Sequence, residues 1–401
     1  MLHFISKDKL INSVFLLPLV WMATGMLWDG DGDMRLVPIV LVSMFVSIIF
    51  FKFNCIAFNF SRNPWTKLLL LSSLFGTVAY VTYGFDSREL RATLVVLFLL
   101  LTLPRKLFSK RYFQWFLLLS SISCALYGYE YQFITKLARG HWPINAIPYA
   151  TICGLLLITS VGFLIANYNG KSKLSLCFSA VLSMLGVVLS QSRGPLLSIF
   201  LVLFSFFCLL FFFRNKLVLF LSFFLILLFG TILSQTSLVG ERIERTYSEY
   251  QAIKKGELNT SIGIRLQMYS IALDLWKNKP ILGYGDKVKD KFNEMERKEI
   301  ITSKVNRLIS MTFHNGYLDK FVLYGLLGGA IFLLFIMFPI YHSFQFSLQE
   351  GSFLLWGPAV FFALCNLTDA PFINAQAAVY YMFFIGYIYM MLSEEKRALN
   401  S

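Results

Sequence analysis

Residues 321–340 read FVLYGLLGGAIFLLFIMFPI, an unbroken apolar stretch inside the longer run 317–341. A helix needs about 20 such residues to cross the hydrocarbon core of a bilayer. Comparable runs recur along the chain, whose 401 residues are 57% hydrophobic and only 14% charged. A soluble domain has about 25% charged residues. The composition therefore excludes a soluble multi-domain enzyme, a disordered protein and a coiled coil. The runs are continuous rather than alternating, which also excludes a transmembrane barrel.

The apolar runs predict an all-α polytopic membrane protein with about twelve transmembrane helices. The predicted spans are 11–27, 36–56, 67–83, 90–103, 113–129, 146–168, 174–190, 195–213, 217–233, 317–341, 352–368 and 376–392. An even number of spans places both termini on one side of the membrane. The first run has no small-residue cleavage site near its end, so we expect an uncleaved span rather than a removed signal peptide.

Basic residues decide which side that is. The formal net charge is +14, and about fifteen lysines and arginines lie in the short segments on the side of the termini, against about six in the opposite short loops. The positive-inside rule then places both termini in the cytoplasm. Because the charge orients the spans, it does not indicate nucleic-acid binding. The predicted division is 1–233 with nine spans, 234–316 as one large outer loop, and 317–401 with three spans and a short cytoplasmic tail.

The large outer loop contains a predicted amphipathic helix over residues 262–279. Its apolar side chains recur at helical spacing on one face, at Ile264, Met268, Ile271 and Leu275. Ser261 is the expected cap and Pro280 the expected stop. Such a helix can lie on the membrane surface or against the bundle of spans. The six cysteines lie in or beside apolar runs without CxxC spacing, so the sequence indicates neither disulfides nor a zinc site.

Two arginines are candidates for binding an anion. Arg193 interrupts two apolar runs on the outer side, in Ser190–Pro195, where an arginine is costly unless it reaches the interface or an anion. Arg265 lies near the start of the predicted loop helix, a place suited to bidentate contacts with phosphate. The ordinary alternatives are an arginine that extends to the interface, for Arg193, and a solvated charge, for Arg265.

A histidine is the candidate general base. His314 lies in Phe313-His314-Asn315-Gly316-Tyr317, where the loop re-enters the membrane. An imidazole there can accept a proton from an attacking hydroxyl. Of four histidines, His141 is the rival on the outer face, and an interfacial hydrogen-bonding role is the alternative for both. Carboxylates that a proton-coupled carrier needs deep in the bundle are sparse, since Asp319, Asp369 and Glu130 all lie near outer ends.

Three motifs in this order resemble the O-antigen ligase (WaaL) and polymerase superfamily. They are Ser192–Leu197, then Arg265–Trp276 with Pro280 and Leu282–Gly285, and then His314-Asn315 followed after nine residues by Gly325. Gly328 departs from the family's pattern, which more often has threonine or valine there. The motifs cover roughly residues 190–330, and twelve spans with one large outer loop before the tenth resemble the family over the whole chain.

The resemblance implies a membrane-embedded GT-C-type glycosyltransferase that inverts the anomeric carbon and needs neither a metal nor another cofactor. Its partners would be membrane lipids, an undecaprenyl-diphosphate-linked O-antigen as donor and lipid A–core as acceptor, at the periplasmic face of the bacterial inner membrane. By motif position His314 would be the general base, and Arg193 and Arg265 would hold the donor diphosphate. Further candidate substrate-binding residues on the outer side are Arg88, Arg91, Arg139, His141, Gln191 and Asn315.

Three alternative functions stay open from the sequence. An O-antigen polymerase would use the same donor with a second lipid-linked glycan as acceptor, but polymerases more often have two substantial outer loops. A transferase that acts on protein hydroxyls tends to have a longer soluble C-terminal part. A transporter of lipid-linked glycans has no use for a histidine at the outer boundary. We therefore expect the ligase.

Overall fold

The computed structural model describes residues 7–166, 172–213 and 237–400, and these form an all-helical protein without a strand. The helices of the first part are α1 Lys7–Ala23, α2 Gly25–Trp28, α3 Gly32–Phe51, α4 Asn54–Arg62, α5 Pro64–Thr82, α6 Ser87–Thr102, α7 Lys110–Tyr129, α8 Ala146–Ile165, α9 Ser172–Leu189 and α10 Arg193–Phe213. The later helices are α12 Ser237–Lys254, α13 Ser261–Asn278, α14 Val288–Arg297, α15 Ser303–Ile309, α16 Gly316–Ser343, α17 Ser352–Thr368 and α18 Ala375–Asn400. The all-α prediction is confirmed.

Six of the described helices are long and apolar enough to cross a membrane, namely α3, α5, α8, α9, α16 and α18. Shorter apolar helices cover Ser13–Trp28, Arg193–Cys208 and Ser352–Thr368. The predicted span 217–233 lies outside the described residues, and the total of twelve stays a prediction. The chain is a multi-helix membrane protein by length and composition of these helices.

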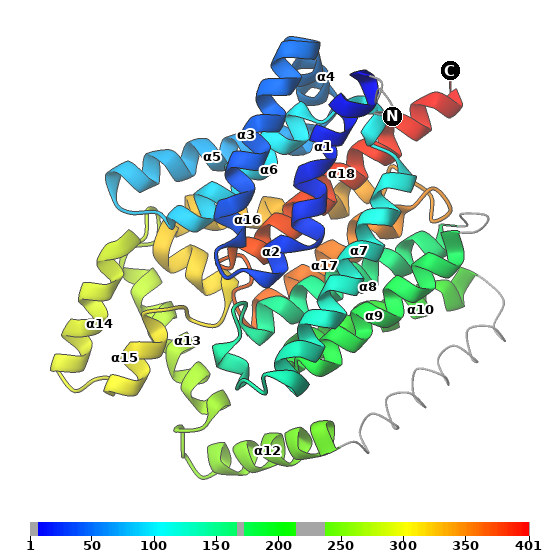
Figure 1. The fold of residues 1–401 in the computed structure, drawn as a ribbon. Helices are drawn as coiled ribbons and strands as arrows, with labels where there is room; N and C mark the ends of the chain where they lie inside the picture. The colour runs from blue at the N-terminus through cyan, green and yellow to red at the C-terminus, as the bar shows by residue number, and fades with distance from the viewer. Residues whose placement is uncertain (1–6, 167–171, 214–236, 401) are drawn as a thin grey trace.

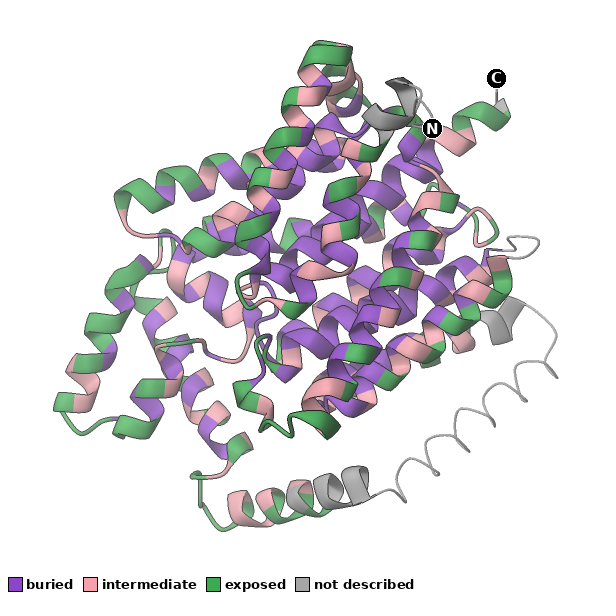
Figure 2. Ribbon diagram, in the orientation of Figure 1, coloured by how far each residue is buried: buried purple, intermediate pink, exposed green. Residues whose placement is uncertain are grey.

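The centre of the bundle is α18, which is buried along almost its whole apolar length and packs against α6, α8 and α17 (Figure 2). Small side chains at the contacts between helices let the helices approach closely, as is typical of membrane proteins. The hydroxyl of Ser121 on α7 lies 2.6 Å from that of Ser179 on α9, which lies 3.0 Å from that of Ser160 on α8. Aromatic rings fill the rest, such as Phe362 stacked on Tyr381 with centroids 4.0 Å apart.

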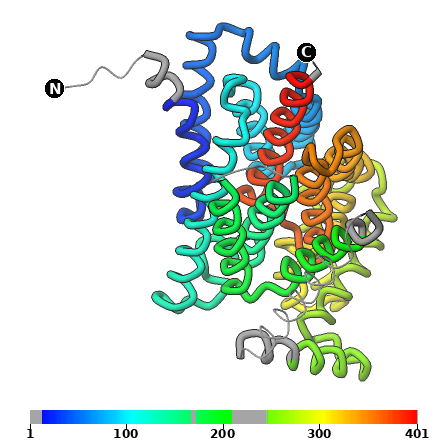
Figure 3. The backbone as a smooth tube through the Cα atoms, turned by 90° about the vertical axis from the view of Figure 1, so that its right-hand side faces the viewer, coloured from blue at the N-terminus to red at the C-terminus, as the bar shows by residue number. Residues whose placement is uncertain are grey.

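Residues 237–316 form a separate layer of helices α12–α15 at one end of the bundle (Figures 1 and 3). The first turn of α1 and the last turn of α18 both lie at the opposite end. This layer has a small apolar core of its own, to which α13, α14, α15, the segment after α15 and α16 contribute Ile264, Met268, Leu275, Phe292, Val305, Ile309, Phe313 and Val322. The predicted amphipathic helix is thus confirmed, and its apolar face packs inside the protein rather than on a membrane.

Three local predictions need correction. The cap of α13 is Thr260, whose hydroxyl accepts the N–H of Gly263, and not Ser261, which is the first helical residue. The predicted span 36–56 is two helices, because Lys52 adopts a positive φ of 53° between α3 and α4. The predicted span 317–341 lies in α16, but its backbone leaves the helical conformation at Gly325, with φ 62° and ψ −158°.

Candidate active site

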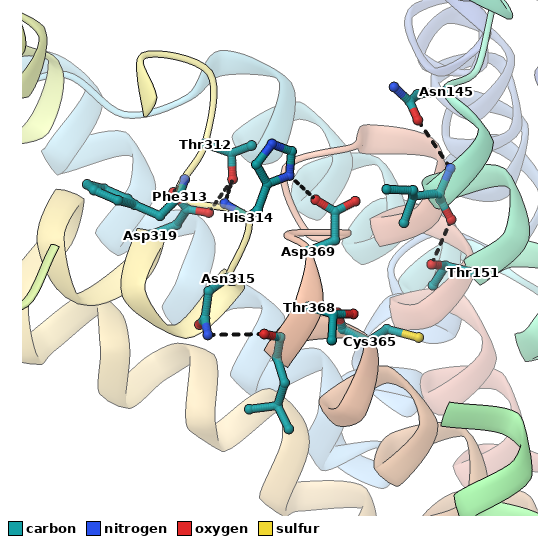
Figure 4. A network of polar contacts seen from close by, with 12 residues as sticks. Asn145, Thr151, Thr312, Phe313, His314, Asn315, Asp319, Cys365, Thr368 and Asp369 are labelled. Atoms are coloured by element: carbon teal, nitrogen blue, oxygen red, sulfur yellow. Dashed lines mark hydrogen bonds and ion pairs between the residues drawn. The ribbon is translucent and has the colours of Figure 1, made fainter. Parts of the chain in front are cut away.

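His314 is paired with a carboxylate. Its Nδ1 lies 2.9 Å from Oδ1 of Asp369, the residue that follows α17, and both side chains are largely buried (Figure 4). An ionised carboxylate only accepts hydrogen bonds, so opposite such a group Nδ1 of a neutral ring is the donor and Nε2 is the acceptor. The pair is the arrangement in which a carboxylate orients a histidine for work as a base.

The backbone at His314 is strained and is held by neighbouring polar groups. Its φ is 52°, a left-handed conformation that is uncommon for a non-glycine residue. Buried Asp319 accepts the N–H of Phe313 at 3.0 Å and the hydroxyl of Thr312 at 2.6 Å. The N–H of His314 in turn donates to the Thr312 hydroxyl at 3.0 Å. Strain of this kind persists only where surrounding contacts maintain it, and it concentrates at functional sites.

Asn315 has a structural role next to this pair. Its side-chain oxygen caps α16 by accepting the N–H groups of Tyr317 and Leu318, each at 3.1 Å. Its amide donates to the carbonyl of Leu367 at 3.2 Å. The N–H of Gly316 donates to the carbonyl of Asp369 at 3.0 Å. These bonds join the start of α16 to the end of α17, and substrate binding by Asn315 stays a prediction.

The Arg193 motif packs against the same end of α17. A Cβ atom added to Gly194 would lie 2.5 Å from the hydroxyl oxygen of Thr368, so the backbone here approaches as closely as only glycine permits. Arg193, the first residue of α10, bonds through its guanidinium to the hydroxyl of Thr246 on α12. Its other terminal nitrogen lies 3.9 Å from the carboxylate of Glu249. Arg193 therefore connects the bundle to α12.

Arg139 contacts the Arg193 motif, a relation that the sequence alone did not decide. Its guanidinium donates to the hydroxyl of buried Ser192 at 2.9 Å, and Ser192 donates to the carbonyl of Ala146 at 3.1 Å. His141 belongs to the same short turn and is exposed. Gln191 has a positive φ of 52° at the turn that precedes α10. Arg139 is thus adjacent to the candidate anion site, whereas no described bond connects His141 to it.

Arg265 lies on α13, and this helix contacts the site through Tyr269. Tyr269, one turn further along α13, places its hydroxyl 3.1 Å from the carbonyl oxygen of His314 and 3.2 Å from that of Leu367. Burial raises the pKa of Tyr269, and the positive charge of Arg265 partly opposes this rise. The carboxylate of Glu249 also accepts the N–H of Ile262 in the first turn of α13, at 3.0 Å. One acidic side chain therefore lies between the two helices that carry Arg193 and Arg265.

The end of α17, residues 366–369, is the point where all three motifs meet. Asn366 and Thr368 contact Gly316 and Gly194, Leu367 accepts bonds from Asn315 and Tyr269, and Asp369 holds His314. Sequence reasoning placed Asp369 only as a carboxylate at an outer end of a span. The shared outer placement of a histidine and an aspartate was a weak signal for their pairing, and 55 residues separate the two.

The remaining two candidate arginines, Arg88 and Arg91, lie near the start of α6. The guanidinium of Arg91 is bound to Asp33 of α3, with nitrogen–oxygen distances of 2.6 and 3.1 Å, while Arg88 is exposed. Between them in the sequence, Glu89 forms a buried ion pair with Lys320 of α16. The charge of Arg91 is thus paired in a contact between helices. A role for either arginine in binding phosphate stays a prediction.

The glycine motifs explain the kink in α16. The loop after α13 packs on the kink, where Leu326 donates its N–H to the carbonyl of Pro280 at 2.8 Å. A Cβ on Gly325 would lie 2.1 Å from the carbonyl oxygen of Ile281, and one on Gly283 would lie 2.5 Å from that of Leu323. Both glycines have positive φ. The glycine that follows His314-Asn315 in the motif therefore permits a close backbone contact with the second motif.

Within the described ranges, no three histidine, cysteine, aspartate or glutamate side chains are grouped as a metal site. Catalysis without a metal stays a prediction. What the arrangement offers chemically is one oriented base beside several cations, at the end of a membrane bundle.

Comparison with known proteins adds two findings. Residues 178–333 match the family model described as O-antigen ligase. The matched range contains Arg193, Arg265 and His314, but ends before Asp369. A protein of Haemophilus influenzae that is described only as uncharacterized is 31% identical over 107 residues, which are 25% of this chain and 26% of that protein. The chain thus spans about a quarter of that relative.

Proposed function

We propose that this protein, a member of the O-antigen ligase and polymerase superfamily by its match over residues 178–333, is a ligase. It would transfer an O-antigen glycan from undecaprenyl diphosphate to a sugar hydroxyl of lipid A–core, which is the last step of lipopolysaccharide assembly. The family match supports a membrane glycosyltransferase of the ligase or polymerase type. One large loop domain before α16, within the described residues, favours the ligase over the polymerase.

The observation that carries the proposal is the His314–Asp369 pair beside the Arg193 and Arg265 segments. In the proposed reaction Nε2 of His314 accepts the proton of the acceptor hydroxyl while its oxygen attacks the anomeric carbon. The bond from that carbon to the diphosphate oxygen breaks, and undecaprenyl diphosphate leaves with the bonding electrons. A single displacement of this kind inverts the anomeric carbon. A positioned base contributes about 10²–10⁴-fold in rate.

Arginines account for the leaving group in this scheme. Departure of the lipid diphosphate concentrates negative charge on phosphate oxygens, and guanidinium groups stabilise such charge by bidentate hydrogen bonds. Donors that are fixed before the reaction need no reorganisation in the transition state. Arg193 is bonded to Thr246, and Arg265 lies one turn from Tyr269 on a helix that is bonded through Ile262 and Tyr269, on either side of Arg265. The scheme therefore requires neither a metal nor another cofactor.

The proposed orientation places the site in the periplasm. The loop domain, which is the layer of helices α12–α15, lies at one end of the bundle, and the start of α1 and the end of α18 lie at the opposite end (Figure 3). Together with the excess of basic residues on the side of the termini, this supports cytoplasmic termini in the bacterial inner membrane and a GT-C-like arrangement. We propose residues 1–233 and 317–401 as the spanning parts and 234–316 as the periplasmic loop.

The test is transfer by purified protein in proteoliposomes, with undecaprenyl-diphosphate glycan as donor and two acceptors in parallel reactions. The acceptors are lipid A–core and a second donor molecule. Product on lipid A–core that is lost in His314→Ala and Arg265→Ala would support the ligase. Lengthened lipid-linked glycans would instead make the protein a polymerase. No product on either acceptor from folded protein would contradict both.

A further inference from the structure

The loop that follows α13 is fixed to the kink of α16. Besides the bond from Leu326 to Pro280, the N–H of Tyr284 donates to the carbonyl of Val322 at 3.0 Å. At the other end of the loop, the N–H of Asp286 donates to the carbonyl of Tyr83, just after α5, at 3.1 Å. The loop therefore rests on the end of α5 and on the kink of α16, two helices that are apolar and long enough to span a membrane.

Beyond the kink, α16 exposes a continuous apolar stripe. Its exposed large side chains recur at helical spacing and are Leu326, Leu327, Leu333, Leu334, Met337 and Tyr341. In a membrane-spanning helix such a stripe faces lipid hydrocarbon, because no described part of the protein covers it. Val78 and Val81, in the last turn and a half of α5, are exposed as well. The lipid-facing surfaces of both helices thus border the loop.

Two large apolar side chains of the loop extend this surface. Ile281 is 63% exposed and Leu282 is 55% exposed. They follow Pro280, whose carbonyl is bonded to the first residue of the α16 stripe. Adjacent exposed apolar side chains that continue a lipid-facing stripe bury their area most simply in the same hydrocarbon.

Basic residues flank these apolar side chains. Lys279 and Lys287 are both exposed, and the ammonium of Lys279 lies 4.7 Å from the centre of the Tyr284 ring. Lysines beside apolar residues at a membrane surface direct their charge toward lipid phosphate while their stems stay near hydrocarbon. This loop therefore places two lysines where lipid headgroups lie and an apolar pair between them where the hydrocarbon begins.

We propose that residues 279–287 form a membrane anchor on the loop-domain side of the bilayer. Ile281 and Leu282 insert into the acyl chains of that leaflet, and Lys279 and Lys287 contact the phosphates of anionic phospholipids. The anchor sets the height of α13, and with it Arg265, above the lipid surface. The assignment does not depend on the proposed reaction.

Photocrosslinking tests the apolar part. Benzoylphenylalanine would replace Ile281, and in a matched control Ile300, in full-length protein in nanodiscs of phosphatidylethanolamine and phosphatidylglycerol. Ile300 is 62% exposed as well, but it lies in the turn between α14 and α15, away from α5 and α16 (Figure 1). We expect phospholipid adducts at position 281 at least tenfold above those at 300. Equal yields, or adducts at 281 to a second copy of the chain, would overturn the anchor.

The lysines are tested by the class of lipid recovered. Mass spectrometry of the adducts at position 281 gives the ratio of phosphatidylglycerol to phosphatidylethanolamine. One lysine near an anionic surface corresponds to about a fivefold preference, so Lys279→Gln with Lys287→Gln should lower this ratio by at least that factor. Lys304→Gln, at an exposed position of α15, is the control and should leave it unchanged. An unchanged ratio in the double variant would overturn the headgroup assignment.

Discussion

The carboxylate of Glu249 lies 3.9 Å from the guanidinium of Arg193 and accepts the N–H of Ile262 at the start of α13 through its other oxygen. A single side chain thus relates the two segments that carry the proposed diphosphate-binding arginines. Glu249 also places negative charge at a helix N-terminus, where it is favourable. It therefore connects Arg193 on α10 to the first turn of α13, the helix that carries Arg265.

Substitutions of Glu249 separate its geometry from its charge. Glu249→Ala removes both contacts and should raise the KM for donor about three- to tenfold, the factor expected from loss of a cap-like bond of about 1 kcal/mol. Glu249→Gln keeps an acceptor for Ile262 and removes a negative charge beside the phosphates, so its KM should stay at or below that of wild type. Donor titrations at saturating acceptor measure both. Equal effects of the two substitutions would contradict the positioning role.

Asp369 should matter for turnover rather than for donor binding. Asp369→Asn keeps the volume but no longer forces the proton onto Nδ1 of His314, so kcat should fall by up to about 10⁴-fold, as for the wrong tautomer of a catalytic histidine. His314→Ala should lower kcat by about 10²–10⁴-fold. The check is kcat under saturation together with the Kd for undecaprenyl diphosphate. Loss of donor affinity in Asp369→Asn, with kcat unchanged, would assign the carboxylate to another role.

Three glycine substitutions should differ in stability for stated reasons. Gly325→Ala meets a positive φ of 62° and a carbonyl oxygen 2.1 Å from the new Cβ. Gly256→Ala meets only a positive φ of 83°, and Gly140→Ala meets neither obstacle. The left-handed conformation alone costs about 1–2 kcal/mol, so thermal unfolding in detergent should rank Gly140→Ala highest in Tm and Gly325→Ala lowest. Similar Tm values for Gly325→Ala and Gly256→Ala would show that the loop at Ile281 moves away from a new Cβ at little cost in stability.

Arg88 and Arg91 should separate binding from stability. Arg91→Ala leaves the buried carboxylate of Asp33 without its ion-pair partner, which we expect to cost about 1–3 kcal/mol of unfolding free energy. Arg88→Ala removes an exposed charge and should leave Tm within about a degree, while weakening donor binding if this end of α6 contributes to the field around the phosphates. Unfolding and donor titrations on both variants make the comparison. Unchanged donor affinity in Arg88→Ala would remove α6 from the site.

Metal independence has a direct test. Transfer by protein that is purified and assayed in excess EDTA should proceed at the same rate as in Mg²⁺, because guanidinium groups supply the positive charge that a metal would otherwise bring. The rate in EDTA relative to that in Mg²⁺ is the measurement. A loss in EDTA that Mg²⁺ or Mn²⁺ restores would require a metal site that the proposed scheme lacks.

The sequence by itself determined the membrane class, the helices and the order of the motifs. These depend on local properties, since a run such as 321–340 is apolar whatever surrounds it, and α13 begins and ends beside residues that cap or stop a helix. The motif arginines and His314 were found for the same reason. The errors at the cap of α13 and at Lys52 are of one or a few residues.

Only the tertiary structure decided which of these residues work together. The pairing of His314 with Asp369, the bridge from Glu249 to Arg193 and the contact of Gly283 with the kink at Gly325 join residues that are far apart in the chain. Neither hydropathy nor spacing encodes such contacts, because they depend on how whole helices pack. The end of α17 became the meeting point of the motifs through the close approach of Gly194 and Gly316 to it, a relation that exists only once the bundle has formed.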